Sequence, residues 1–212
     1  PPAGGGRSGG VAFQTALILG SRVVGAVSTA VITIVLARLL GVTGYGDYAL
    51  ALTIATLAGL FASLGIDSAT SKWVAEGFNR GDAVWRVIRT GLRIRTVLAS
   101  ITFGLLFLLA GPVAELFGKP ELADAVRAAS VALAFSAGFS WVSGIYEGLR
   151  GGLMLAVISL VKAVVEFVIV VGALAMGYGV VAALLGNAAS YLGAVAVGLY
   201  GMRAHLRRGD AS

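Results

Sequence analysis

Six long apolar runs, separated by short polar segments, occupy most of this 212-residue chain. Each run reaches the roughly 20 residues that a helix needs to cross a hydrocarbon core about 30 Å thick. Hydrophobic residues make up 58% of the chain and charged residues only 12%, which is too little polar surface for a soluble domain. The runs are continuous, whereas transmembrane β-strands alternate. The sequence therefore predicts an all-α integral membrane protein with six transmembrane helices.

These spans are predicted to form one transmembrane bundle, residues 11–202. Residues 1–10 are glycine-rich and are expected to be a disordered leader. Because the chain begins without methionine, we interpret it as a fragment or a trimmed chain. Residues 203–212 are expected to be a basic cytoplasmic tail. The six spans are predicted at residues 11–40, 48–66, 94–112, 126–146, 153–176 and 180–202.

The distribution of lysine and arginine predicts the orientation. Positive residues are enriched in the cytoplasmic segments of membrane proteins. With the N-terminus inside, only Arg38, Lys119 and Arg127 fall in outer segments, while eleven basic residues fall in inner ones. Both termini are therefore expected to be cytoplasmic, in the cell (inner) membrane.

A basic amphipathic helix is predicted at about residues 82–95, running into the third span. Its apolar residues recur at helical spacing, and Arg86, Arg89 and Arg93 fall on a neighbouring face. Two interpretations remain open. The helix either anchors the chain at the interface without a transport role, or these arginines contact anionic lipid headgroups.

Three ionisable residues lie within the predicted spans, where such groups are costly and usually face a cavity or a partner. They are Arg22, Lys162 and Glu166. In one interpretation, Lys162 and Glu166 form a pair that neutralises itself. In the other, Arg22 and Lys162 line a polar cavity and attract an anionic substrate, while Glu166 relays a proton or cation. Asp67 and Glu147, near span ends, are interpreted as interfacial.

Composition excludes several kinds of site. The chain has no cysteine, and its only histidine, His205, is in the basic tail, so neither a zinc site nor a catalytic triad is expected. The sequence predicts no catalytic residue, metal or cofactor. The net charge is +6, but the basic residues are concentrated in the inner segments between the spans. Their placement is explained by membrane orientation, so no nucleic-acid partner is expected. A membrane-embedded enzyme is disfavoured because the acidic residues of the outer loops are scattered.

The 31 glycines are predicted to serve mainly in helix packing, because small residues let helix backbones approach closely. Gly144, Gly148 and Gly152 repeat every four residues. Further pairs with this expected role are Gly20 and Gly25, Gly172 and Gly177, and Gly193 and Gly198.

The loops carry motifs that resemble those of polysaccharide and O-antigen flippases. These are proteins of the multidrug, oligosaccharidyl-lipid and polysaccharide flippase superfamily. Residues 37–50 read ARLLGVTGYGDYAL, like the family's first outer loop. The segment after the second span carries LGIDSAT, VAE and RGD at residues 64–70, 74–76 and 80–82. GLRG at 148–151 and GYGVVAA at 177–183 resemble the turns after the fourth and fifth spans.

The resemblance implies one bundle of a two-bundle transporter, since family members have twelve to fourteen spans. It implies that the chain is the N-terminal part of a flippase that moves lipid-linked oligosaccharide across the cytoplasmic membrane on polyprenyl diphosphate. The implied partners are this lipid-linked glycan, membrane lipids, and a missing C-terminal bundle or a second copy. Two alternatives stay open: a non-transporting scaffold of a polysaccharide synthesis complex, and a multidrug-type exporter with the same fold.

Overall fold

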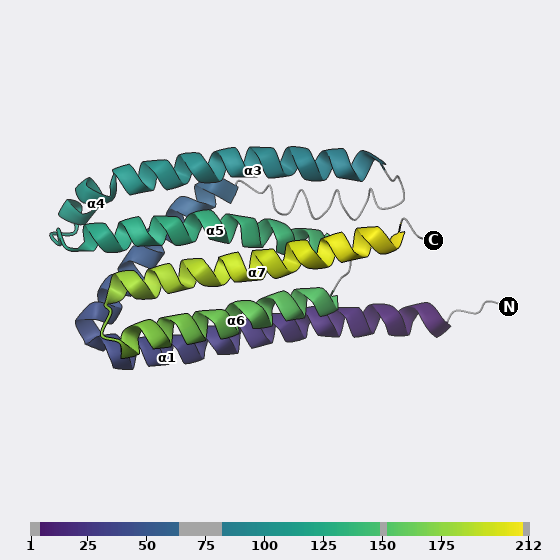
Figure 1. The fold of residues 1–212 in the computed structure, drawn as a ribbon, viewed down its shortest axis with the longest axis horizontal. Coiled ribbons are helices and arrows are strands. Elements are labelled where there is room, and N and C mark those ends of the chain that lie inside the picture. The colour runs from purple at the N-terminus through teal and green to yellow at the C-terminus, as the bar shows by residue number, and fades with distance from the viewer. Residues whose placement is uncertain (1–4, 64–81, 149–151, 210–212) are drawn as a thin grey trace.

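The computed structural model describes residues 5–63, 82–148 and 152–209, and the regular structure in these ranges is entirely α-helical. The long helices run up and down beside one another, and α1 begins at the same end of the bundle at which α7 ends (Figure 1). The predicted all-α class is confirmed. The helices are α1 (Gly5–Ser63), α3 (Asp82–Leu108), α4 (Ala110–Leu116), α5 (Leu122–Gly148), α6 (Gly152–Ala175) and α7 (Val180–Gly209).

Five of these helices are long and apolar enough to cross a membrane, so the chain is a multi-pass membrane protein. The described ranges contain these candidates in α1, α3, α5, α6 and α7. The candidate in α1 covers 37 residues, Gly25–Phe61. A straight helix of that length would extend about 55 Å, nearly twice the roughly 30 Å of a hydrocarbon core.

Gly41 bends α1 within this stretch. Its φ of 70° and ψ of −179° are not helical, and its φ lies in the region that glycine adopts without steric cost. The sequence predicted a loop at residues 41–47 between two spans. Instead, the helix resumes directly after Gly41, so one kinked residue replaces the predicted loop. In Figure 1 the chain turns at this end of the bundle, and the second part of α1 passes behind α7 and α5.

The other helix ends differ from the predicted boundaries by a few residues. α3 ends at Leu108 because Pro112 has no N–H to donate to the Leu108 carbonyl, and the chain continues as the separate short helix α4. The predicted third span, 94–112, is therefore divided. The fourth and fifth predicted spans correspond to α5 and α6 to within four residues.

Three helices also extend into segments that were predicted to have other roles. α1 begins at Gly5, inside the predicted leader 1–10. α7 continues to Gly209, inside the predicted tail 203–212. α3 is one helix through residues 82–95, so the predicted amphipathic segment and the following span are continuous. The interfacial placement of that segment remains a prediction.

Glycine packing is confirmed where Gly198 of α7 meets α5. A Cβ on Gly198 would lie 2.5 Å from Val142 Cγ1, so the close approach of these two helices depends on the missing side chain. At Gly193 a Cβ would lie 3.7 Å from Val165 Cγ2 of α6, which is an ordinary van der Waals distance. The remaining predicted pairs behave differently. Gly20, Gly25 and Gly172 face open space, and Gly177 has a φ of 84° in the turn before α7.

Replacing Gly198 by valine is expected to lower the free energy of unfolding by about 1–3 kcal/mol, because the new side chain overpacks the contact with Val142. The matched control is Gly172→Val, which adds the same side chain to a helical glycine with nothing within 4 Å. Denaturation in detergent measures both variants. Equal loss of stability in the two would show that close packing at Gly198 is not the cause.

Candidate functional site

A cavity of about 670 Å³ lies between α1, α3, α5, α6 and α7. Along α5 it extends from Ala129 to Glu147, a rise of about 27 Å for a regular helix. Its walls combine apolar side chains with a set of polar ones. Seven serine and threonine side chains line it: Ser28, Thr29, Thr56, Ser136, Ser140, Ser143 and Ser159.

Four charged residues also line this cavity. Lys162 and Glu166 come from α6, Arg95 from α3 and Glu147 from α5. Ionisable groups among membrane-spanning helices are costly and usually mark a pathway or a binding site. Two of these groups are basic and two are acidic, so the formal charges of the described cavity residues cancel.

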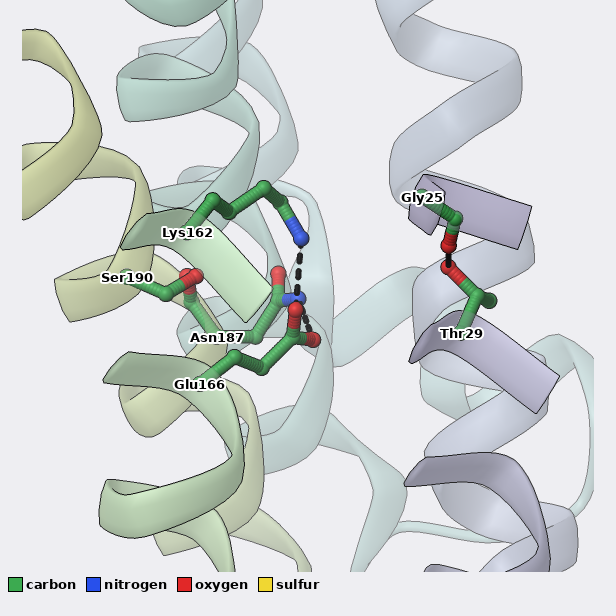
Figure 2. Close-up of polar contacts among 6 residues, drawn as sticks. All are labelled: Gly25, Thr29, Lys162, Glu166, Asn187 and Ser190. Carbon is green, nitrogen blue, oxygen red and sulfur yellow. Dashed lines mark hydrogen bonds and ion pairs between the residues drawn. The ribbon is translucent and has the colours of Figure 1, made fainter. Parts of the chain in front are cut away.

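The central feature of the site is a cluster in which the Glu166 carboxylate receives two donors. Lys162 Nζ lies 2.5 Å from Glu166 Oε2, and Asn187 Nδ2 of α7 donates to Glu166 Oε1 at 2.5 Å. Figure 2 shows Lys162 and Glu166 on α6 meeting Asn187 on α7, with Gly25 and Thr29 of α1 on the other side. The cluster thus connects α6 and α7 through a buried hydrogen bond between polar side chains.

Helical geometry explains why α6 presents these groups. Lys162 and Glu166 are four residues apart and therefore lie on one face. Glu166 continues the buried stripe of α6 that contains Leu155, Ile158 and Val170. Lys162 is ten residues after the start of α6, or about 15 Å along its axis, which is near the middle of a hydrocarbon core of about 30 Å.

The side chain of Lys162 is the more exposed of the pair. The side chain of Lys162 is 19% exposed, and that of Glu166 is 9% exposed. Lys162 Nζ also lies 4.7 Å from the centroid of the Tyr191 ring, within the range of a cation–π contact. The ammonium is therefore held by a carboxylate and an aromatic ring in the wall of the cavity.

The structure combines features of the two interpretations of these charges. The predicted Lys162–Glu166 pair is present, and the same residues line a polar cavity. Arg22 belongs to α1, but its side chain lies outside the part that the structure describes. The roles of Lys162 and Arg22 in substrate binding and of Glu166 in coupling remain predictions.

The predicted headgroup contacts are also untested. Arg93 is exposed on α3, whereas the side chains of Arg86 and Arg89 are outside the described part of the chain. Among the described residues, no group of three or more histidine, cysteine, aspartate or glutamate side chains is placed to hold a metal ion.

Sequence reasoning missed three residues of the cavity. Arg95 was counted with the cytoplasmic arginines, but it is only 6% exposed, and its Nε donates to the Ala137 carbonyl at 3.3 Å. Arg95 is four residues before Ala99 and eleven before Leu106, which puts the three side chains on one helical face. This spacing could have indicated that Arg95 faces the bundle. Asn187 was overlooked as a lone amide in an apolar run, although it is 5% exposed. Glu147, interpreted as interfacial, lines the cavity.

Comparison with known proteins covers nearly the whole chain. The model of a family described as polysaccharide biosynthesis protein matches residues 12–211. No curated protein and no solved structure matches the chain. The family match agrees with the resemblance carried by the loop motifs, and the chain therefore belongs to the polysaccharide biosynthesis protein family.

Proposed function

We propose that this chain is the N-terminal part of a flippase for lipid-linked oligosaccharide. Its cargo is a glycan on polyprenyl diphosphate, moved from the cytoplasmic to the outer leaflet of the cell membrane. The observation that carries the proposal is the polar cavity, which places Lys162 near the middle of a span. Membership of the polysaccharide biosynthesis protein family supports the same substrate class.

The chemistry of the cavity suits such a cargo. A diphosphate and a hydroxyl-rich glycan cannot enter hydrocarbon without losing hydrogen bonds to water. The serine and threonine hydroxyls of the cavity wall offer hydrogen bonds to the cargo, although Thr29, Thr56 and Ser136 already donate to backbone carbonyls and can only accept. The Lys162 ammonium offers charge compensation. The role we propose is therefore that of a transporter, in keeping with membership of the polysaccharide biosynthesis protein family.

The proposed transport function also includes a topology of six membrane spans. The kink at Gly41 divides the apolar part of α1 into two segments, each close to the length of a span. With the four other candidates these segments give six spans, and an even number puts both termini on the same side. The distribution of lysine and arginine supports the cytoplasmic side. A second bundle then supplies the opposite wall of the path, as in transporters built from two halves.

Single-cysteine labelling tests this orientation, because the natural chain contains no cysteine. Lys119 is half-exposed and pairs with Asp47 at 2.6 Å, in the region predicted to be outside. In right-side-out vesicles, Lys119→Cys is expected to react with an impermeant maleimide, and Arg207→Cys is expected to react only after permeabilisation. The reverse pattern would contradict the proposed orientation.

The function is tested with the full protein that contains this chain, reconstituted in liposomes. The probe is a fluorescent disaccharide on polyprenyl diphosphate, and dithionite bleaching reports the fraction in the outer leaflet. Exchange between leaflets is expected to be faster than in protein-free liposomes. An unchanged exchange rate, with the same protein moving a cationic dye, would favour a multidrug-type exporter. Movement of neither probe would favour a scaffold.

A further inference from the structure

The two oxygens of Glu166 are held by donors from different helices. Oε2 receives Lys162 of the same helix, and Oε1 receives Asn187 of α7. A carboxylate accepts both donors at once. If Lys162 moved away, the carboxylate would therefore keep the donor from α7.

The three side chains differ in their freedom to move. Lys162 is the most exposed of them and has a flexible four-carbon stem. Asn187 is 5% exposed, and its Oδ1 is buried without a hydrogen-bond partner in the described part of the chain. An unsatisfied buried acceptor is costly. The amide orientation is therefore set by its donation to Glu166, not by a partner for Oδ1.

We infer that Lys162, Glu166 and Asn187 form an exchange site for a phosphate-type anion. When the ligand binds, the Lys162 ammonium leaves the Glu166 carboxylate and pairs with a phosphate oxygen of the ligand. Asn187 is the positioning residue: it keeps its hydrogen bond to the Glu166 carboxylate while Lys162 is away. No covalent bond changes and no proton moves. The ligand class is a diphosphate, free or esterified. This inference rests on the proposed function, since the cargo supplies the diphosphate.

The cost of breaking the ion pair explains why Asn187 is needed. A buried carboxylate that loses its counter-charge is strongly destabilised in a low-dielectric interior. The remaining hydrogen bond from Asn187 stabilises that carboxylate more when it is alone than when it is paired. The ammonium also has a second contact besides Glu166. Lys162 Nζ lies 4.7 Å from the centroid of the Tyr191 ring, which stabilises the cation when it leaves the carboxylate.

Diphosphate binding to the purified full-length protein tests the exchange. The probes are farnesyl diphosphate and inorganic diphosphate, measured by calorimetry in detergent. Glu166→Gln is expected to bind about tenfold more tightly than the natural protein, because Lys162 no longer has to leave a carboxylate. Lys162→Gln is expected to bind about tenfold or more weakly, because the charged donor is gone.

A double-mutant cycle isolates the role of Asn187. Asn187→Leu is expected to weaken binding roughly three- to tenfold when Glu166 is present. In the Glu166→Gln background, the same change is expected to alter binding less than about twofold, since no carboxylate is left to retain. Ser190→Ala is the control, because its hydroxyl donates only to the Asn187 backbone carbonyl and does not touch Glu166.

Three results would overturn the inference: weaker binding by Glu166→Gln than by the natural protein, an equal effect of Asn187→Leu in both backgrounds, or no binding of either probe. The predicted order of variants with inorganic diphosphate supports a site for the bare anion. The same order with farnesyl diphosphate alone supports a site for the lipid-linked form. A protein that shows this order but does not flip lipid contradicts only the proposed function. Flipping with the order reversed contradicts only the exchange.

Discussion

Replacing Lys162 by methionine is expected to lower the free energy of unfolding by about 3–5 kcal/mol, because it leaves the Glu166 carboxylate without its counter-charge. Glu166 is buried, with a side chain that is 9% exposed, so water from the cavity replaces the lost ammonium only in part. The hydrogen bond from Asn187 remains and places the expected loss toward the lower part of this range. Denaturation of the reconstituted protein measures the change.

Two control variants separate charge from packing. Replacing both Lys162 and Glu166 by methionine removes the pair together and is expected to cost less than Lys162→Met, since both desolvation penalties disappear and only the Asn187 amide loses its acceptor. Lys119→Met breaks a pair in which Lys119 is 49% exposed and is expected to cost less than about 1 kcal/mol. A double variant as unstable as Lys162→Met would contradict this account of the pair.

The second large effect is on transport. Lys162→Gln is expected to slow flipping of a diphosphate-linked glycan roughly ten- to a hundredfold, the effect of losing one hydrogen bond to a charged group. The reason is that Lys162 is the described cation that lies near the middle of α6 within the cavity. The leaflet assay measures the rate at equal amounts of reconstituted protein.

The control for this effect is Lys119→Gln, which removes a lysine outside the cavity and is expected to leave the rate unchanged. Arg22→Ala tests the second predicted substrate-binding residue in the same assay. An unchanged rate with Arg22→Ala removes that residue from the path, and an unchanged rate with Lys162→Gln removes Lys162 from it.

Most of the helices could be predicted because the length of an apolar run is a local property of the sequence. The Lys162–Glu166 pair was also predictable, since a four-residue spacing puts two side chains on one helical face. The sequence predicts a loop of several residues where the structure has a kink at Gly41. Its motif contains three glycines, and the sequence did not distinguish the one with positive φ, Gly41, from Gly44 and Gly46.

The remaining parts of the site depend on how helices pack, which the sequence did not reveal. Asn187 contacts Glu166 only because α7 lies against α6, where a Cβ on Gly186 would lie 2.9 Å from Val170 Cγ2. Arg95 faces the cavity because α3 packs against α5, where it donates to Ala137. Counting basic residues near span ends predicts orientation, but it does not show which of them turn inward.

The most direct test compares one glycan on two carriers, polyprenyl diphosphate and an uncharged polyprenyl ether, in the leaflet assay with the full-length protein. If the cavity compensates the charge of the diphosphate through Lys162, the natural protein will move the diphosphate form faster, and Lys162→Gln will abolish that preference. Equal rates for the two carriers in the natural protein, or an undiminished preference in Lys162→Gln, would contradict the account.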